Sequence, residues 1–486
     1  MPMMTNMPKT FLLAGREVSG EGRELIVTNP ADGSVVGEIC CASVEQVRMA
    51  FSRHKAAIAQ NDWFRLPPHE RASVLFGAAQ CMLDHSTQLA RLQTAENGKT
   101  LRESQGQVKS AAGIVRYFGS VCESLEGETP PSRGPYLSVT TYEPLGIVAA
   151  ITPWNSPLTM AAQKIAPALA AGNAVILKPS ELTTLVSIEL ARAFMDAGLP
   201  EGLLSVLPGE RDIGEAIVSH PDLAMVSFTG GTDAGRAIAE SVAGRFMPTI
   251  LELGGKSPNI VFADADLDAA AQGVSSAIFG SGGQSCVAGS RLFIERGIYD
   301  EFVERLVTCA GKLRVGPPLE VTSDIGPMAS EKQRERIESY VDIARQEGGR
   351  ILLGGQRPDA SDCKQGAYYL PTIIDGLDHN SRICQEEIFG SVLCVLPFDA
   401  EDDLVRQAND TIFGLACGIW SSDVQKAWRV AGAVKAGTVW INTYKQLSIA
   451  APFGGYKQSG LGREKGIQGL RAYQQTKSIY LGGFGE

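Results

Sequence analysis

The chain has 486 residues, of which 44% are hydrophobic and 20% are charged, and its formal net charge is −10. This length exceeds what one hydrophobic core supports and predicts two large domains. The acidic balance argues against nucleic acid or an anionic membrane as a partner. Without an uninterrupted run of about 18 apolar residues, no membrane-spanning helix is expected.

The ten cysteines and five histidines form no metal-binding pattern. There is neither a Cys-x-x-Cys nor a His-Glu-x-x-His motif, so neither structural zinc nor a catalytic metal is expected. The N-terminus lacks a basic segment followed by an apolar one, as a secretory leader would have. The sequence therefore favours a reduced, cytoplasmic setting.

The first part of the chain is predicted to be helical. Amphipathic periodicity covers 43–60 and 68–95, and 98–120 continues it. A segment rich in proline and glycine at 126–134 ends this region. The next segment, 136–142, alternates in the manner of an exposed strand.

From residue 146, short apolar runs alternate with helical segments. Strands are expected at 147–151, 174–177, 204–207 and 225–228, and helices follow them at 158–170, 184–197, 212–219 and 233–243. Apolar runs without polar alternation are typical of buried parallel strands. The order predicts an α/β fold with a Rossmann-like, doubly wound parallel sheet.

A second α/β region is expected at 255–457, with strands near 258–262, 291–295, 391–396 and 438–441. The strand at 136–142 and another at 476–481 stand apart from both regions. Because isolated strands are unstable, we expect these two to pair with each other or with another subunit's sheet. The predicted units are a dinucleotide-binding domain (1–123 and 145–254), a catalytic domain (255–460) and oligomerisation strands (124–144 and 470–486).

Cys286 follows a glycine-rich turn in Gly282-Gly-Gln-Ser-Cys286. We expect it to open a helix, where the helix dipole and free N–H groups favour the thiolate. A lone cysteine is more often a buried structural residue, but this glycine-rich context favours a nucleophile.

Two further residues have the chemistry to assist a nucleophile. Asn155 follows the first buried strand, at the sheet edge where ligands bind, and its amide can donate to an oxyanion. The ordinary alternative is a turn or N-cap asparagine. Glu252 precedes Leu253-Gly-Gly-Lys256 and can act as a general base, whereas a solvated or salt-bridged carboxylate is its ordinary alternative.

Nucleotide-binding features follow the second and fourth strands. Lys178 can bind a ribose or phosphate, and Glu181 can accept from ribose hydroxyls, which favours NAD over its 2′-phosphate. A capped helix start explains this segment equally well. The turn Phe228-Thr-Gly-Gly-Thr-Asp-Ala-Gly235 offers amides to a pyrophosphate, although Thr232 replaces the middle glycine of the dinucleotide fingerprint.

Together these segments resemble the aldehyde dehydrogenase family. The matching blocks extend over nearly the whole chain: Pro153-Trp-Asn155, Lys178-Pro-Ser-Glu181, Phe228-Thr-Gly230, Glu252-Leu-Gly-Gly-Lys256, Gly283-Gln-Ser-Cys286, Glu386-Glu-Ile-Phe-Gly390 and Pro452-Phe-Gly-Gly-Tyr-Lys457.

The resemblance implies a role for each matched residue. Cys286 is the nucleophile, Glu252 the general base, and Asn155 forms the oxyanion hole with the backbone N–H of Cys286. The implied cofactor is NAD, with NADP as the alternative, bound by Thr152, Trp154, Lys178, Glu181, Gly209, Phe228, Gly230, Gly231, Leu253, Glu387 and Phe389. Gly231 stands where the family often has serine, which removes a hydroxyl contact to phosphate. The resemblance also implies a homodimer or homotetramer assembled through the two isolated strands.

The expected substrate pocket comprises Ser156, Met160, Gln163, Ser285, Leu447 and Phe453. The first three share one helix face, and many family members have bulky aromatic residues at the first and third of these positions. The smaller residues here predict a wide access tunnel for bulky or aromatic aldehydes. No arginine lies on this face, so a tightly bound ω-carboxylate is less expected, although Lys445 or Arg291 could bind one.

The expected reaction is oxidation of an aldehyde to its carboxylic acid through a thiohemiacetal and a thioester on Cys286. One alternative is a coenzyme-A-acylating semialdehyde dehydrogenase, which the presence of Glu252 disfavours. Another is a cysteine hydrolase, which is disfavoured because all histidines lie outside the matching blocks. A third is an inactive, crystallin-like relative, which the intact Cys286, Glu252 and Asn155 disfavour.

Overall fold

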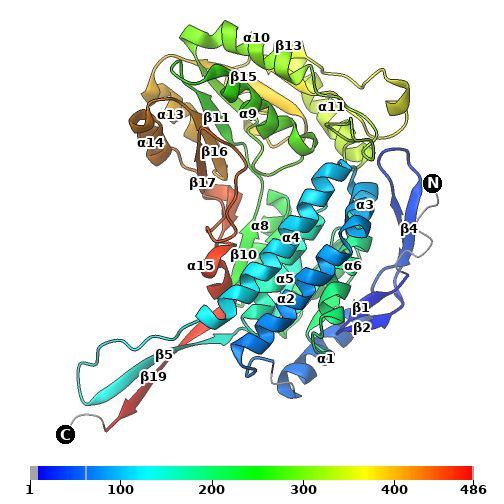
Figure 1. Ribbon diagram of the computed structural model, residues 1–486, viewed down its shortest axis with the longest axis vertical. Coiled ribbons are helices and arrows are strands. Elements are labelled where there is room, and N and C mark those ends of the chain that lie inside the picture. The colour runs from blue at the N-terminus through cyan, green and yellow to red at the C-terminus, as the bar shows by residue number, and fades with distance from the viewer. Residues whose placement is uncertain (1–8, 61–62, 484–486) are drawn as a thin grey trace.

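The computed structural model describes residues 9–60 and 63–483 (Figure 1). Within them, two large sheets with flanking helices form two halves of the molecule, and a two-stranded arm projects from one half (Figure 1). None of the described helices has the length and apolar character needed to cross a membrane.

The N-terminal part begins with two hairpins that the sequence analysis did not predict: β1 (Phe11–Leu13) with β2 (Arg16–Val18), and β3 (Glu24–Thr28) with β4 (Val35–Cys40). The predicted helices follow as α1 (Val44–Gln60), α2 (Pro68–Asp84), α3 (Ser86–Asn97) and α4 (Leu101–Val121). The helix expected at 68–95 is thus two helices. They meet at His85, whose N–H donates to the Cys81 carbonyl and ends α2.

The first large sheet has the order β18-β10-β9-β6-β7-β8 and is parallel except for β18. Its strands are β6 (Ile147–Ile151), β7 (Ala174–Lys178), β8 (Leu204–Val206), β9 (Leu223–Thr229), β10 (Thr249–Glu252) and β18 (Gly460–Leu461). Its helices are α5 (Pro157–Ala170), α6 (Thr184–Asp196), α7 (Arg211–Val218) and α8 (Thr232–Ala243). The prediction of a Rossmann-like sheet is confirmed, and β10 and β18 are additions to it.

The second large sheet has the order β13-β14-β15-β12-β11-β16-β17, with only β13 antiparallel to its neighbour. Its strands are β11 (Pro258–Val261), β12 (Arg291–Glu295), β13 (Arg350–Leu353), β14 (Thr372–Asp375), β15 (Val392–Phe398), β16 (Ala416–Trp420) and β17 (Thr438–Ile441). Its helices are α9 (Leu267–Phe279), α10 (Tyr299–Ala310), α11 (Glu331–Gln346), α12 (Arg382–Gln385), α13 (Glu401–Asn409) and α14 (Val424–Ala433). The four predicted strands are present, whereas β13, β14 and β16 were not predicted.

The arm consists of β5 (Tyr136–Pro144) and β19 (Gln474–Gly482), which pair antiparallel along their whole length. The short helix α15 (Gly466–Arg471) leads into β19. The expectation that the two isolated strands pair with each other is confirmed. The arm carries exposed apolar side chains at its end, namely Ile479, Tyr480 and Leu481.

The carboxyl ends of β6, β7, β9 and β10 lie at one edge of the first sheet, because these strands are parallel neighbours. Every residue of β6 and β7 is buried, as their apolar sequences predict. This edge is where doubly wound sheets bind ligands, and Thr152, Lys178, Gly230 and Glu252 lie at or just beyond it.

Candidate active site

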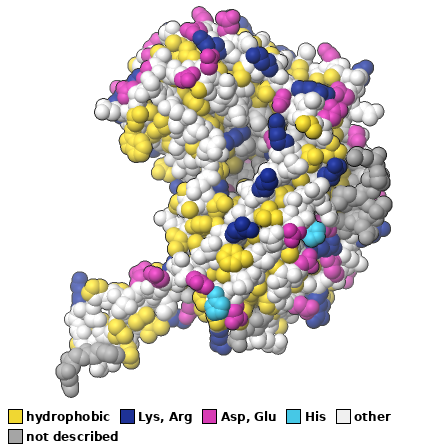
Figure 2. All heavy atoms as spheres, viewed as in Figure 1, with side chains coloured by type: hydrophobic (Ala, Val, Ile, Leu, Met, Phe, Trp, Pro, Cys, Tyr) yellow, Lys and Arg dark blue, Asp and Glu magenta, His cyan; other side chains and the backbone are white. Residues whose placement is uncertain are grey.

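A cavity of about 1450 Å³ lies at this edge and also contacts residues of the second half. A pocket for one small ligand typically measures about 300–1,000 Å³, so this volume accommodates a nucleotide and a second molecule. The surface is hollowed between the two halves on the face shown in Figure 2. Cys286, Glu252 and Asn155 all line the cavity, so the structure brings the three predicted catalytic residues together.

The loop that carries Cys286 does not open a helix. Gly280–Gly283 forms a turn in which Ser281 and Gly282 have left-handed φ values of +60° and +61°, and Cys286 lies in a second turn shortly after it. Gly283 has a φ of +70°, and a Cβ there would lie 2.1 Å from the Gly390 carbonyl oxygen, so only glycine fits. The expected helix dipole is therefore absent at Cys286, and that prediction was wrong.

The electrostatic environment of Cys286 also differs from the expected one. Burial raises the pKa of its thiol to about 12, and the carboxylates of Glu252 and Glu387 act in the same direction. Lys465 and the N–H of Val287 oppose this shift of the pKa. The thiol is therefore protonated at neutral pH and needs a proton acceptor before it can attack.

Asn155 is tied directly to the Cys286 loop. Its Nδ2 donates to the Gln284 carbonyl oxygen at 3.0 Å, and the Gln284 side chain accepts from the Ala329 N–H at 2.9 Å. A side-chain amide has two N–H donors, so the second one remains for an oxyanion in the cavity. Asn155 precedes Ser156, the N-cap position of α5, and is not itself the helix cap.

Glu252 ends β10 and is almost fully buried, and neither carboxylate oxygen has a hydrogen-bond partner among the described residues. Burial raises its pKa well above the usual value, and the charge of Glu464 adds to this shift. Lys164, Arg463 and Lys465 oppose it. A raised pKa makes this carboxylate a stronger base than an ordinary glutamate, which suits a general base.

The partners of Glu464 were not predicted. Glu464 accepts hydrogen bonds from Lys164 and Gln163, and from the Ser227 hydroxyl at 3.3 Å. Tyr473 in turn donates to Ser227 at 3.0 Å. A signal did exist in the sequence, since Lys164 lies within an apolar helix and a buried lysine requires a charged or polar partner.

Most of the predicted cofactor residues line the cavity: Thr152, Trp154, Lys178, Glu181, Phe228, Gly230, Gly231, Leu253, Glu387 and Phe389. Gly209 is not one of them. Gly209 precedes α7. A Cβ at Gly209 would lie 2.4 Å from Cγ1 of Ile213, so close packing against Ile213 explains the glycine at this position.

The first residues of α8 line the cavity, and no described side chain accepts a hydrogen bond from the backbone N–H groups of its first turn. Its N-cap residue is Gly231, which offers no side-chain oxygen to the first turn. The buried hydroxyls of Thr152, Thr229 and Thr232 also lack a partner among the described residues. Free backbone N–H groups and unused hydroxyls at a helix start fit a phosphate group.

Lys178 and Glu181, the predicted ribose-binding residues, line the same cavity. Burial lowers the pKa of Lys178, and its Nζ donates to the Pro179 carbonyl at 3.1 Å. Ser180 accepts from the Leu182 N–H at 3.3 Å and so caps the 3-10 helix Glu181–Thr183. The helix-start explanation therefore holds for Ser180, while Lys178 and Glu181 remain available to a ligand.

The loop carrying Glu387 and Phe389 is held on several sides. Glu387 accepts from the Gly255 N–H at 3.1 Å, and Arg336 donates to its carbonyl at 2.7 Å. Phe389 packs edge to face with Trp154, at a centroid distance of 5.3 Å, and Gln333 donates to its carbonyl at 2.8 Å. These contacts connect the two halves across the cavity.

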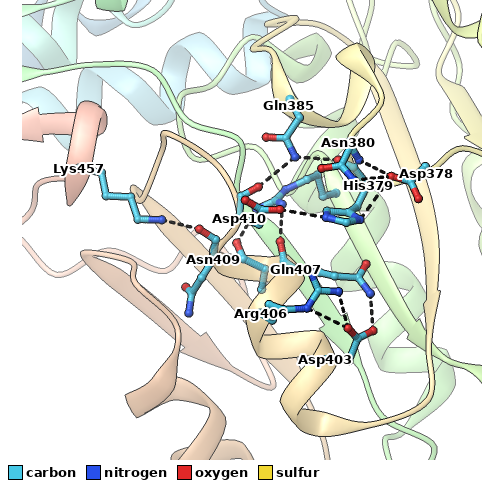
Figure 3. A network of polar contacts seen from close by, with 12 residues as sticks. Asp378, His379, Asn380, Gln385, Asp403, Arg406, Gln407, Asn409, Asp410 and Lys457 are labelled. Carbon is cyan, nitrogen blue, oxygen red and sulfur yellow. Dashed lines mark hydrogen bonds and ion pairs between the residues drawn. The ribbon is translucent and has the colours of Figure 1, made fainter.

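A polar network anchors the segment that precedes Glu387 in the chain (Figure 3). Gln385 donates to the carbonyls of His379 and Asp410 at 2.7 and 3.0 Å. The ring of His379 lies 3.0 Å from the Asp410 carboxylate, and Lys457 donates to the Asn409 carbonyl at 2.6 Å. The network fixes the segment before Glu387 relative to the end of α13.

All residues predicted for the substrate pocket line the cavity: Ser156, Met160, Gln163, Ser285, Leu447 and Phe453. We call this part of the cavity, together with Cys286, the tunnel. Lys445 also lines it, but Arg291 does not. The Arg291 guanidinium is fully buried and donates to the carbonyls of Lys256, Gln407 and Ala408, so it cannot bind a substrate.

The tunnel contains one further cation that the sequence analysis missed, Lys465, which directly follows Glu464. No spacing or motif signalled it, because its position depends on a contact between distant segments.

Across the residues that the structure describes, no group of His, Cys, Asp and Glu is arranged to hold a metal ion.

Residues 18–479 match the family model described as the aldehyde dehydrogenase family. Betaine aldehyde dehydrogenase of Mesorhizobium japonicum is 40% identical over 96% of this chain and 96% of its own. That of Bacillus subtilis is 37% identical over 98% of this chain and 97% of its own.

Solved structures agree with these sequence matches. Betaine aldehyde dehydrogenase from Staphylococcus aureus, in complex with NAD+, superposes with a TM-score of 0.97 at 36% identity, covering 99% of this chain and 96% of that one. A mutant of the P. syringae indole-3-acetaldehyde dehydrogenase AldA, in complex with NAD+ and IAA, superposes with a TM-score of 0.96 at 36% identity. The match covers 99% of this chain and 97% of that one. The chain therefore belongs to the aldehyde dehydrogenase family.

Proposed function

We propose that this enzyme oxidises an aldehyde to its carboxylic acid, with NAD+ as the electron acceptor and a thioester on Cys286 as the intermediate. One observation carries the proposal. Cys286, Glu252 and Asn155 line a single cavity, and the adjoining part of that cavity has the free helix start and unused hydroxyls that a dinucleotide requires.

The residues around the adjoining part fit NAD+. The start of α8 would hold the pyrophosphate, Lys178 and Glu181 the adenosine ribose, and Glu387 with Phe389 the nicotinamide riboside. Glu181 disfavours a 2′-phosphate by charge, so NAD is preferred over NADP. Bound NAD+ supplies the acceptor for the hydride that the substrate carbon loses.

The first half of the reaction forms a bond between the Cys286 sulfur and the aldehyde carbon. Because the thiol is protonated, its proton passes to water in the cavity as the sulfur attacks, and Glu252 stays free for the second half of the reaction. The carbonyl oxygen becomes an oxyanion, which the Asn155 amide and the Cys286 N–H stabilise. Loss of hydride from this adduct leaves a thioester on Cys286.

The second half of the reaction hydrolyses the thioester. Glu252 takes a proton from water, the hydroxide attacks the acyl carbon, and the carboxylic acid leaves as the Cys286 sulfur is released. The presence of this base favours hydrolysis over transfer to coenzyme A. Among the described residues that line the cavity there is no histidine, which disfavours a cysteine hydrolase.

The tunnel supports bulky or aromatic aldehydes as substrates. Ser156, Met160 and Gln163 line the tunnel, and none of them carries an aromatic ring, which supports a broad opening to Cys286. A relative named for indole-3-acetaldehyde, an aromatic substrate, supports this class. The relatives named for betaine aldehyde offer a small cationic alternative.

The same proposal includes how the chain is organised. We propose a dinucleotide-binding domain (1–123 and 145–254), a catalytic domain (255–460) and an oligomerisation arm (124–144 and 470–486). The exposed apolar end of the arm supports a homodimer or homotetramer. A cytoplasmic location suits an enzyme with free cysteines.

The experiment is a panel of aldehydes followed at 340 nm with NAD+ and NADP+ separately, together with identification of the product. The free acid should form without coenzyme A. Cys286→Ala should lose turnover and retain cofactor binding, whereas Cys309→Ala, which removes a half-buried thiol on α10, should retain both. Turnover that survives Cys286→Ala would overturn the proposal.

A further inference from the structure

Lys465 is held in the tunnel by a contact between two distant segments. Phe453 and Glu464 form an antiparallel bridge, in which each N–H donates to the other's carbonyl at 2.8 Å. The next residue, Lys465, adopts a left-handed φ of +59°. Its Nζ lies 5.0 Å from the centroid of the Phe453 ring. The bridge therefore places this ammonium group beside an aromatic wall of the tunnel.

The Lys465 side chain has no partner of opposite charge. Its relative exposure is only 7%, and no described residue accepts a hydrogen bond or forms an ion pair with Nζ. Burying an ammonium group is costly without such a partner, and the face of Phe453 compensates only in part. Burial accordingly lowers the pKa of Lys465, although Glu464, Cys286 and Glu252 raise it.

The nearby carboxylates are already engaged. Glu464 is bound by Lys164 and Gln163, and Glu103 accepts from the Ser281 N–H at 2.7 Å and the Thr100 N–H at 3.1 Å. Glu252 is without a partner, but it is the base that the proposed reaction needs free. The charge of Lys465 is thus left for a group that enters the tunnel.

A second cation lines the same tunnel. The Nζ of Lys445 lies 3.3 and 3.4 Å from the carbonyls of Ser276 and Gly280, and no carboxylate in the described chain lies within ion-pair distance. Burial lowers the pKa of Lys445 to about 8, so a substantial fraction is charged at neutral pH. Two cations without counter-ions make this part of the cavity attractive to anions.

We propose that the aldehyde this enzyme oxidises carries a carboxylate as a second group, and that Lys465 is the residue that binds it. The inference rests on the proposed function and specifies its substrate class as semialdehydes of dicarboxylic acids, including carboxylated aromatic aldehydes. Lys465 thereby supplies the positive charge that the helix face of Ser156, Met160 and Gln163 lacks. A substrate bearing a quaternary ammonium group is disfavoured, because the two lysines repel it.

The test compares substrates of matched shape. The aromatic series is 4-carboxybenzaldehyde, its methyl ester and 4-(trimethylammonio)benzaldehyde, and the aliphatic pair is 4-oxobutanoate and butanal. In at least one series the carboxylate should have a kcat/KM about tenfold or more above the neutral analogue, as expected for a charge-assisted hydrogen bond. A neutral or cationic analogue that is preferred in both series would overturn the proposal.

Variants test the role of Lys465 itself. Lys465→Met should reduce the carboxylate preference about tenfold or more, and Lys465→Arg should retain most of it. The preference is a ratio measured on one preparation, so a partly unfolded sample does not change it. Lys55→Met is the matched control, because it removes a lysine that pairs with Asp222 on the surface. An unchanged ratio in Lys465→Met would overturn the assignment to Lys465.

The outcomes separate this inference from the proposed function. If no aldehyde, benzaldehyde included, yields NADH, then the proposed oxidation fails. If neutral aldehydes are oxidised and carboxylates are not preferred, then only the carboxylate inference fails.

Discussion

Asn155 donates from Nδ2 to the carbonyl oxygen of Gln284 at 3.0 Å, which connects the first sheet to the loop of Cys286. We propose that the same amide, which lines the cavity, also donates to the oxyanion. Asn155→Ala should therefore lower kcat by about 10²–10³-fold, the usual effect of losing one such donor. Steady-state kinetics measures the loss, and NAD+ binding, followed by fluorescence, is the control. A decrease below fivefold would contradict the role of Asn155.

Glu252→Gln should slow acyl release more than hydride transfer, because hydrolysis of the thioester needs the base. Rapid mixing with NAD+ and aldehyde should then show a burst of NADH close to one per active site, followed by slow turnover. Glu215→Gln, which changes a surface carboxylate paired with Arg211, should behave as the unmodified enzyme. Equal slowing of both phases would exclude Glu252 as the hydrolytic base.

The raised thiol pKa of Cys286 predicts how fast it is alkylated in the enzyme without cofactor. With a pKa of about 12, the reactive thiolate fraction increases about tenfold for each unit of pH from 7 to 9. Iodoacetamide labelling, quantified by mass spectrometry at Cys286, should follow that slope without reaching a plateau. A plateau below pH 8 would show that the thiol is already ionised there.

Loss of the Glu252 charge should also accelerate this labelling, since that carboxylate raises the pKa of the thiol. Glu252→Gln thus combines slower turnover with faster alkylation. A variant that was merely misfolded would label its other cysteines faster too, which the same mass spectra would reveal.

Met160→Trp should narrow the tunnel, because Met160 lines it and makes no side-chain hydrogen bond among the described residues. We expect kcat/KM for benzaldehyde to decrease at least about tenfold more than that for acetaldehyde, since an added indole competes for the same space. Met49→Trp on the exposed face of α1 is the control. An unmodified enzyme that strongly prefers acetaldehyde to benzaldehyde would contradict the wide tunnel.

His54 makes stability dependent on pH. It is fully buried between the Gly202 carbonyl and the Ser205 hydroxyl, each at 2.7 Å, and burial lowers its pKa to about 4 from 6.5. Because the unfolded chain binds this proton more tightly, stability is lost as the pH falls from 6.5 towards 4. The shift corresponds to a loss of about 3 kcal/mol.

Melting temperatures at pH 7.5, 6 and 5 would measure this loss. His54→Gln should show a flatter dependence on pH from a lower starting stability, whereas His69→Gln, at an exposed position, should follow the unmodified protein. Parallel curves for His54→Gln and the unmodified protein would rule out His54 as the cause.

The elements that were predicted correctly are those whose own residues indicate whether the element is buried or exposed. The short apolar runs of β6 and β7, which alternate with helical segments, are typical of buried parallel strands, so the first sheet could be predicted from them. By contrast, β18 has two residues and exists only because β10 lies beside it. The break at His85 was missed because the apolar periodicity continues across it.

The candidate catalytic residues Cys286, Glu252 and Asn155 could be singled out because each stands in a distinctive local segment. Their conformation could not be predicted, since the turn before Cys286 depends on left-handed φ values at Ser281, Gly282 and Gly283. The position of Lys465 in the tunnel could not be predicted from its neighbours in the sequence. Its burial results from the bridge between Phe453 and Glu464, which no periodicity along the chain reveals.

The pairing of Glu252 with Gly460 has a consequence for synthesis on the ribosome. The strand that contains the base is completed at its edge by residues close to the C-terminus. The buried Lys164 likewise depends on Glu464 for its ion pair, because its other partner, the Ser227 hydroxyl on β9, carries no charge. A chain synthesised only as far as β10 therefore lacks the partner of Lys164, and the active centre is complete only once residue 464 has been added.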